Sequence, residues 1–233
     1  MPGRADRALA VVIPAYQAAA TIAEVVARTC RAVSGATVYV VDDGSTDGTR
    51  EQGRGTGATV LAHPTNRGKG AALATGIAAA LAIGADVIVT LDADGQHPPE
   101  VIPRLVPLVR DRVADVVLGA RARTAAMPVG RRWTNRLSAA LASRIGGIRV
   151  PDAQTGFRAL SRRAVEAVRP VEQGYDFETA FLLEALAQGL LVASVPVPTI
   201  YAGGPSHFRP WRDTWRQARV FTRYGRHLIF GAR

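Results

Sequence analysis

The chain has 233 residues, of which 48% are hydrophobic and 21% are charged, a composition that excludes a disordered protein and predicts a folded globular one. The single cysteine, Cys30, excludes a disulfide framework and a zinc cluster and fits a reducing cytoplasm. The net charge of +10 is uneven, because residues 1–100 carry a net charge of −2 and residues 101–233 carry +12. A positive surface on the second half would attract phosphates on nucleic acid, lipid or a small substrate.

The length suits one sizeable α/β domain rather than two. Residues 1–10 lack the apolar core of a signal peptide, and polar residues interrupt every apolar run before the ~20 residues that a membrane span needs. We expect one domain over residues 1–206, divided into halves at 1–100 and 101–206 and followed by a basic segment over residues 207–233.

The first hundred residues alternate between short apolar strands and helices. The expected strands cover residues 9–14, 37–41, 58–61 and 86–91, and the expected helices cover residues 21–33, about 45–52 and 71–83. Thr21 is the expected N-cap of the first helix, and Ser45 or Thr46 that of the second. Strands that alternate with helices predict a mostly parallel, twisted sheet with helices on both faces.

The second half continues the alternation with more irregular connections. The expected elements are a helix from Pro98 to about Arg112, a strand at 114–118, a basic helix at 131–145, a loop and short strand at 150–160, helices at 162–168 and 177–188, and a strand at 191–196.

Polar residues follow three of the predicted strands. They are Pro14-Ala15-Tyr16, Asp42-Asp43 and Asp92-Ala93-Asp94. Ligands of parallel sheets bind beyond the carboxyl ends of the strands, so we expect a site where these segments meet. Asp92 and Asp94 supply oxygen atoms of the kind that a hard divalent cation prefers, although an isolated pair of this spacing is more often a surface turn.

Two features near this edge leave a functional and a structural interpretation open. Lys69 lies in a Gly-Lys-Gly loop before a helix, where backbone N–H groups could approach phosphates, but the spacing is not that of a P-loop. Of Asp42 and Asp43, we expect one to cap the following helix and the other to bind a ligand.

Seven motifs together resemble a known enzyme family. They are PAYQ (14–17), VVDDGSTDGT (40–49), NRGKGAALATG (66–76), LDADGQHPPE (91–100), GAR (119–121), DAQTGFRAL (152–160) and HFRPWRDT (207–214). In this order they are similar to the family 2 glycosyltransferases, and more narrowly to dolichyl- or polyprenyl-phosphate mannosyltransferases of the catalytic-domain-only form. The resemblance implies a GT-A fold, a nucleotide-sugar donor, Mg²⁺ or Mn²⁺, and inversion at the anomeric carbon.

The resemblance also implies roles for individual residues. The metal positions match Asp92, Asp94 and Gln96. The donor positions match these three together with Pro14, Ala15, Tyr16, Gln17, Asp42, Asp43, Lys69, Ala93 and Arg209. The acceptor positions match Arg121, Arg131, Asn135 and Arg158, and the catalytic set is Asp92, Asp94, Arg121 and Asp152.

The chain departs from the family pattern at two of these positions. Gln17-Ala18 replaces the usual Asn-Glu, and Asn135 replaces a serine, so the contacts made by the usual residues are in question. Asp152 is either a general base or a positioning residue, because a lipid phosphate is already ionised at neutral pH and needs no base.

The last segment has the pattern of a basic amphipathic helix. Over residues 210–230, arginines at 212, 216, 219, 223 and 226 share one stripe beside an apolar arc. This pattern fits either a helix on an anionic membrane surface or one packed on the domain.

The sequence therefore predicts an enzyme peripheral to the cytoplasmic face of a membrane that transfers a hexose to a polyprenyl phosphate. GDP-mannose is the expected donor, and mannose the expected hexose. The alternatives are UDP-glucose or another UDP-sugar as donor, or a hydroxyl group as acceptor. A membrane-protein partner and a donor sensor without catalysis remain open. Nucleic-acid binding is not expected, since the basic half lacks a helix-turn-helix or aromatic RNA motif.

Overall fold

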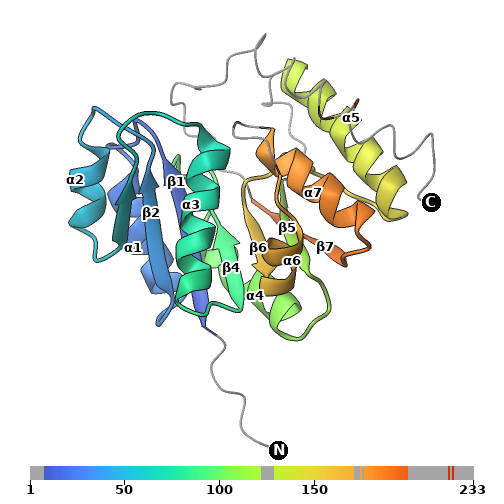
Figure 1. Cartoon of the computed structure of the whole chain (residues 1–233), viewed down its shortest axis with the longest axis horizontal. Helices are drawn as coiled ribbons and strands as arrows, with labels where there is room; N and C mark the ends of the chain where they lie inside the picture. The colour runs from blue at the N-terminus through green and yellow to red at the C-terminus, as the bar shows by residue number, and fades with distance from the viewer. Residues whose placement is uncertain are drawn as a thin grey trace, which may run out of the picture.

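A computed structural model describes residues 8–121, 129–170, 174, 176–198, 220 and 222, with backbone only for 129–134 (Figure 1). The described chain forms a sheet of seven strands in the order β3-β2-β1-β4-β6-β5-β7. The strands are β1 (Leu9–Ala15), β2 (Thr37–Asp42), β3 (Thr59–Ala62), β4 (Val87–Thr90), β5 (Val116–Arg121), β6 (Arg158–Ser161) and β7 (Val192–Val197). All pairings are parallel except those of β6, so the predicted mostly parallel sheet is confirmed.

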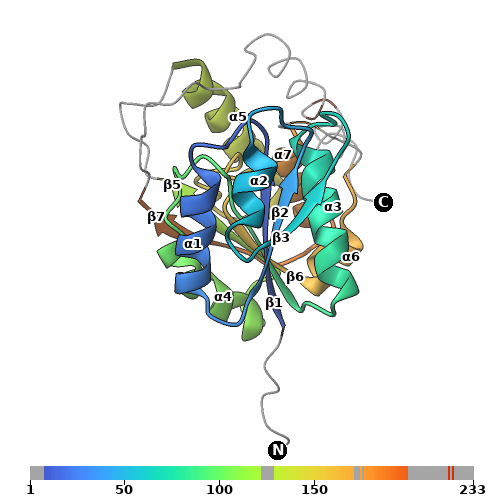
Figure 2. The ribbon, with the colours of Figure 1, turned by 90° about the vertical axis from the view of Figure 1, so that its left-hand side faces the viewer.

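Helices cover both faces of the sheet, as predicted (Figure 2). They are α1 (Ile22–Ala32), α2 (Thr49–Arg54), α3 (Lys69–Ala82), the short 3₁₀ helix η1 (Pro99–Val101), α4 (Ile102–Arg110), α5 (Val129–Gly146), α6 (Arg162–Ala167) and α7 (Phe177–Ala187). Side chains of α1 and α4 form one apolar cluster with the sheet, and those of α3, α6 and α7 form another on the opposite face. Each cluster removes apolar surface from water, which is the main force that holds such layers together.

The antiparallel strand β6 explains how two distant segments reach the same edge of the sheet. Arg158, at the start of β6, pairs with Thr90 at the end of β4 and with Leu118 in β5. Because β6 runs opposite to its neighbours, the loop that precedes it lies beside the carboxyl ends of β4 and β5. The 152–157 loop therefore meets the segments that follow those two strands.

Of the two predicted helix caps, Thr21 is confirmed in position but makes no capping hydrogen bond, and the second is wrong. Thr21 occupies the position before α1, but its hydroxyl donates to the carbonyl of Ala93 at 2.7 Å instead of accepting from the helix. The second helix starts later than Ser45 or Thr46, at Thr49, and Oδ1 of Asp47 accepts the Thr49 N–H. Gly48 precedes it with φ of 87°, a conformation that glycine adopts without strain.

The expected helix over residues 210–230 and the boundary at residue 206 lie outside the described residues, apart from Val220 and Thr222. Val220 is buried and belongs to the apolar cluster of α3 and α7. Among the described helices, none combines the length and apolar character needed to cross a bilayer.

Candidate active site

Asp92 and Asp94 follow β4 at the edge of the sheet where the polar segments meet. The carbonyl between them, on Ala93, is held by the Thr21 hydroxyl, and Oδ1 of Asp94 accepts the backbone N–H of Gln96 at 3.0 Å. Asp94 is exposed at the surface, where partial desolvation and the neighbouring charge of Asp92 raise its pKa. The loop therefore holds two carboxylates whose joint ionisation is unfavourable without a nearby cation.

The 152–157 loop supports Asp92 at very close range. A Cβ atom at Gly156 would lie 2.6 Å from Oδ1 and 2.7 Å from Oδ2 of Asp92. The Thr90 hydroxyl also donates to the Gly156 carbonyl at 2.7 Å. Gly156 is therefore required for close approach rather than for a turn.

Lys69 lies at the start of α3 and reaches the same carboxylate. Its Nζ lies 2.6 Å from Oδ1 of Asp92 and 2.6 Å from Oε1 of Glu178, in the first turn of α7. Burial opposes the charge of Lys69, but the two carboxylates outweigh it and raise its pKa. Burial also opposes ionisation of Asp92, yet the charge of Lys69 lowers the pKa of this carboxyl.

Sequence reasoning did not select Glu178. A signal was present, because Glu178 is an acidic residue in a mostly apolar helical segment, FETAFLLEALA, and such a residue when buried needs a partner.

Arg121 and Asp152 form a two-point ion pair beside the two aspartates. Arg121 donates from Nε to Oδ2 of Asp152 at 2.7 Å and from Nη2 to Oδ1 at 3.2 Å. Asp152 is 1% exposed, and although burial opposes its ionisation, the charge of Arg121 lowers its pKa. A carboxylate held ionised in this way is a weak base, which favours a positioning role.

Arg158 does not bind an acceptor, so this prediction is wrong. It is 2% exposed, and its guanidinium donates to the backbone carbonyls of Thr155, Glu178 and Ala153 at 2.8, 2.7 and 3.0 Å. Burial lowers the pKa of Arg158 to about 10. Its role is to hold the 152–157 loop against α7.

His97 is buried behind the aspartates, with its ring 5.6 Å from that of Phe157 between centroids. Its Nδ1 has no hydrogen-bond partner among the described residues. Burial lowers the pKa of His97 to about 4, so the ring is neutral at neutral pH.

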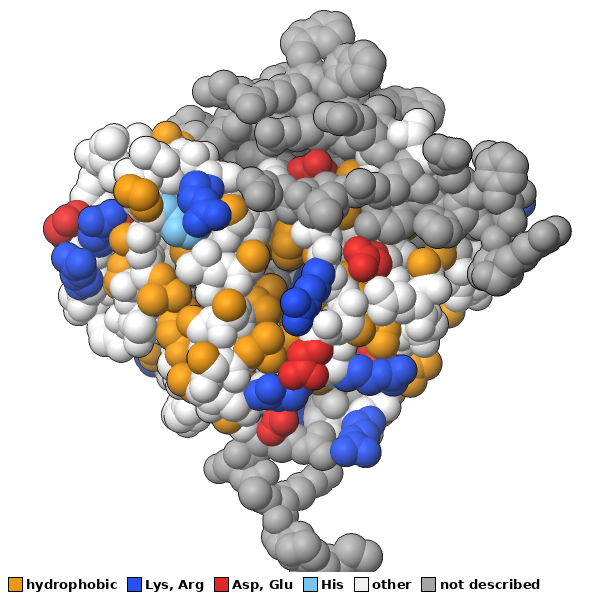
Figure 3. Space-filling model, viewed as in Figure 1, with side chains coloured by type: hydrophobic (Ala, Val, Ile, Leu, Met, Phe, Trp, Pro, Cys, Tyr) orange, Lys and Arg blue, Asp and Glu red, His pale blue; other side chains and the backbone are white. Residues whose placement is uncertain are grey.

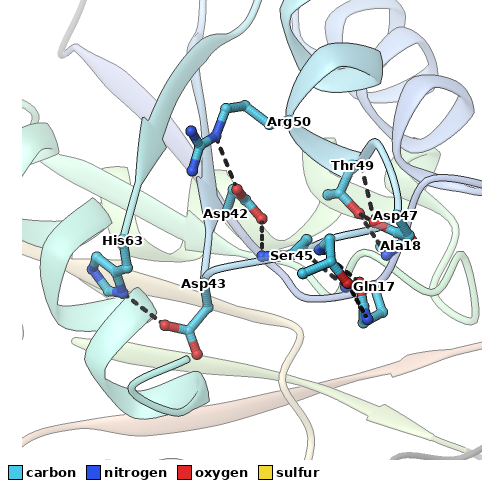
Figure 4. Close-up of polar contacts among 10 residues, drawn as sticks. Gln17, Ala18, Asp42, Asp43, Ser45, Asp47, Thr49, Arg50 and His63 are labelled. Carbon is cyan, nitrogen blue, oxygen red and sulfur yellow. Dashed lines mark hydrogen bonds and ion pairs between the residues drawn. The ribbon is translucent and has the colours of Figure 1, made fainter. Parts of the chain in front are cut away.

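Asp42 and Asp43 are both engaged within the protein (Figure 4). Asp42 accepts the Ser45 N–H through Oδ1 and pairs with Nε of Arg50 through Oδ2. Asp42 therefore closes the turn at Ser45 and does not cap α2, whose N-cap is Gly48, so the expected helix cap is wrong.

Asp43 holds the loop that precedes α3. Its Oδ1 lies 2.7 Å from Nδ1 of His63 and accepts the N–H of Arg67, while Oδ2 accepts the N–H of Gly68. With three protein partners and 2% exposure, the Asp43 carboxylate fixes the loop before α3 and is not open to solvent.

Gln17 braces two loops at the ends of β1 and β2. Its side chain accepts the Thr46 N–H and donates to the Thr46 hydroxyl, and its backbone N–H donates to Ser45 Oγ (Figure 4). Gln17 has φ of 51°, which is uncommon for a residue with a side chain. The adjacent Tyr16 is 40% exposed, and Pro14 and Ala15 are buried at the strand end.

The remaining predicted acceptor and donor positions are only partly described. Arg209 and the side chain of Arg131 lie outside the described residues. Asn135 lies on α5, 4% exposed, and its Oδ1 has no hydrogen-bond partner among the described residues.

The sequence model described as Glycosyl transferase family 2 matches residues 10–169, which is more than half of the chain. The chain belongs to this family. A dolichyl-phosphate hexose transferase of Haloferax volcanii is 34% identical over 205 residues, which cover 87% of this chain and 87% of that protein. An undecaprenyl-phosphate mannosyltransferase of Micrococcus luteus is 30% identical over 198 residues, which cover 80% of this chain and 81% of that protein.

A solved structure supports the same assignment. Glucosyl-3-phosphoglycerate synthase from Mycobacterium tuberculosis, in complex with Mn²⁺, uridine diphosphate and phosphoglyceric acid, matches with a TM-score of 0.76 at 25% identity. The match covers 95% of this chain and 80% of that chain. The predicted GT-A fold is confirmed, and this family 2 glycosyltransferase has its candidate active site at the carboxyl edge of β1, β2 and β4.

The residues of this glycosyltransferase fit a divalent cation. Among the described residues, no group of three His, Cys, Asp or Glu side chains is arranged around one point. Asp92, Asp94 and Gln96 offer two carboxylates and an amide, and a hard cation completes such a set with phosphate oxygens. A cation at these two carboxylates would also offset the repulsion between Asp92 and Asp94.

The charge of this glycosyltransferase is mixed on the face shown in Figure 3. Basic and acidic side chains of the described residues are interspersed there rather than gathered into one positive patch. This pattern gives no support to a nucleic-acid surface on the described part of that face.

Proposed function

We propose that this glycosyltransferase moves a hexose from a nucleotide diphosphate sugar to a polyprenyl phosphate, with inversion at the anomeric carbon. The observation that carries the proposal is the proximity of Asp92 to Lys69 and to the pair of Arg121 and Asp152, which places anionic and cationic groups at one edge. We favour GDP-mannose as donor, with UDP-glucose or another UDP-sugar as the alternative.

The donor side rests on the aspartate loop. Asp92, Asp94 and Gln96 would hold Mg²⁺ or Mn²⁺, whose chemistry is to stabilise negative charge on a departing diphosphate. Lys69 adds a positive charge next to this position, and Arg209 is a further candidate for the donor phosphates. Tyr16, at the exposed end of β1, offers a ring against which a base can stack.

The acceptor side rests on arginine. Arg121 and Arg131 would hold the acceptor phosphate, with Asn135 in the place of a serine. The phosphate oxygen attacks opposite the leaving diphosphate and is already ionised at neutral pH, so no base has to remove a proton. Asp152 then orients Arg121. A hydroxyl acceptor would need a base, and the lowered pKa of Asp152 speaks against that alternative.

The names of the relatives support a lipid phosphate as acceptor, since one is a dolichyl-phosphate hexose transferase and another an undecaprenyl-phosphate mannosyltransferase. The solved structure with uridine diphosphate keeps the UDP-sugar alternative open. We place the enzyme at the cytoplasmic face of the membrane, where the net charge of +12 on residues 101–233 favours an anionic surface, with room for a membrane-protein partner.

The proposal is tested by presenting radiolabelled GDP-mannose, UDP-glucose and UDP-N-acetylglucosamine with a short polyprenyl phosphate, with and without Mg²⁺ or Mn²⁺. We expect label in the lipid fraction from one donor, and only with the metal. Transfer to a free sugar hydroxyl but not to the lipid, abolished in Asp152→Asn, would establish the hydroxyl alternative. Asp111→Asn, on the exposed surface after α4, is the matched control.

A further inference from the structure

Lys69, the only lysine in the sequence, is shared between carboxylates from two distant parts of the chain. Its Nζ lies 2.6 Å from Asp92, after β4, and 2.6 Å from Glu178, on α7. The three side chains are 17%, 24% and 5% exposed, respectively. Two negative charges therefore face one positive charge in a mostly buried group, which leaves a net charge of −1.

The backbone of Glu178 is held in place by a buried arginine. Its backbone carbonyl accepts Nη1 of Arg158 at 2.7 Å, and Arg158 in turn holds the 152–157 loop. The same loop contributes Gly156, which lies against Asp92. Arg158 thus links the backbone of Glu178 to the 152–157 loop, Gly156 of that loop lies against Asp92, and Lys69 lies between the two carboxylates.

The contact between Lys69 and Asp92 conflicts with the proposed metal site. One carboxylate oxygen cannot hold an ammonium group and a divalent cation at short range without strong repulsion between the two cations. Glu178 offers Lys69 a second anionic partner at the same distance. Lys69 can therefore give up Asp92 and remain paired.

We infer that Glu178 is a positioning residue that retains Lys69 when a divalent cation takes over Asp92. The inference rests on the proposed function, since it assumes a cation at Asp92, and it extends that function to a residue that no motif selected. The exchange involves no covalent step and no proton transfer. It keeps the positive charge of Lys69 beside the cation site instead of displacing it into solvent.

The experiment measures binding of Mn²⁺ alone, from the electron paramagnetic resonance signal of the free ion. We expect Glu178→Gln to weaken Mn²⁺ binding at least fivefold, because Lys69 then has Asp92 as its remaining anionic partner in this group. Lys69→Met should bind Mn²⁺ no more weakly than the wild type. The double variant should bind Mn²⁺ more tightly than Glu178→Gln alone, and Glu184→Gln, also on α7, is the matched control.

A second measurement follows the lysine itself. Labelling with ¹³C-lysine gives one side-chain signal per molecule, and we expect Mg²⁺ to shift it in the wild type as Lys69 leaves Asp92. The chemical shift of this signal in the metal-free Glu178→Gln protein also reports whether the variant is folded.

Weaker Mn²⁺ binding by Glu178→Gln, without such a loss in Lys69→Met, separates this role from a structural one. The inference is overturned if Glu178→Gln binds Mn²⁺ like the wild type, if the double variant binds more weakly than Glu178→Gln, or if Mg²⁺ leaves the lysine signal unchanged. If Glu178→Gln does not fold, weaker Mn²⁺ binding by Lys69→Met overturns it instead. A wild type that binds no Mn²⁺ overturns the metal-dependent function as well.

Discussion

A single missing side chain decides how closely two segments approach in the candidate site. Gly156 leaves room for both oxygens of Asp92, which lie within 2.7 Å of the place where a Cβ would be. Contacts this short cannot be absorbed without moving the carboxylate or the loop. The position of Asp92 is therefore set by the residue opposite it as much as by its own strand.

Replacing Gly156 with alanine should displace Asp92. We expect transfer to fall at least tenfold and the apparent affinity for Mn²⁺ to fall with it, measured by labelled transfer across a Mn²⁺ titration. Gly55→Ala is the control, since its Cβ would have its nearest neighbour at 3.6 Å, an ordinary contact. Activity of Gly156→Ala equal to that of Gly55→Ala would show that the close approach does not matter.

His97 gives a residue-scale prediction about pH. Because burial lowers its pKa to about 4 from an ordinary 6.5, the unfolded chain binds more protons than the folded one between these values. The contribution of the neutral His97 ring to the free energy of unfolding is then fully present above pH 6.5. It is lost as the pH falls toward 4, by at most about 3 kcal/mol. Urea unfolding at pH 7 and 4.5 should show a smaller loss in His97→Leu than in the wild type. Equal losses of stability in the two proteins would contradict a lowered pKa of His97.

At the scale of elements, α1 supports the loop that carries the aspartates. The Thr21 hydroxyl holds the Ala93 carbonyl, and Arg28 makes a two-point pair with Glu100 at 2.9 Å for both contacts. The two contacts fix the loop near each end of the segment from Asp92 to Glu100. We conclude that α1 contributes to the geometry of the site without facing a ligand.

Thr21→Val should loosen this support, because the Ala93 carbonyl loses its donor at a net cost of about 1 kcal/mol. We expect weaker Mn²⁺ binding by a few-fold with little change in secondary structure. Thr21→Ser keeps the hydroxyl and should behave like the wild type. Calorimetric titration with Mn²⁺ compares the three proteins, and indistinguishable binding by Thr21→Val would argue against a role for α1.

The alternation of strands and helices sufficed to predict the elements, since apolar periodicity and turn residues are local signals. Local signals failed where a distant segment competes for a side chain. Thr21 has the expected N-cap position of α1, but its hydroxyl donates to the Ala93 carbonyl instead of accepting from the helix. Arg158 has the charge of a phosphate ligand, but three carbonyls surround it. The contact between α3 and α7 brings Lys69 and Glu178 together, and no local pattern contains that contact.

At the scale of the whole molecule, the sheet joins two differently charged halves at one edge. The ends of the parallel strands β2 and β4 supply the aspartates, and β5 with the loop before β6 supplies Arg121 and Asp152. The site lies at their junction, where Lys69 and Arg121 both lower the pKa of Asp92. Donor and acceptor chemistry would thus meet at the residues that bind the cation.

The measurement that tests this account most directly is hexose transfer by Asp94→Ala, compared with the wild type and Asp111→Ala. The account predicts that transfer to polyprenyl phosphate is lost in Asp94→Ala at every Mg²⁺ or Mn²⁺ concentration, while circular dichroism and the unfolding transition stay those of the wild type. Full transfer by a folded Asp94→Ala protein would contradict it.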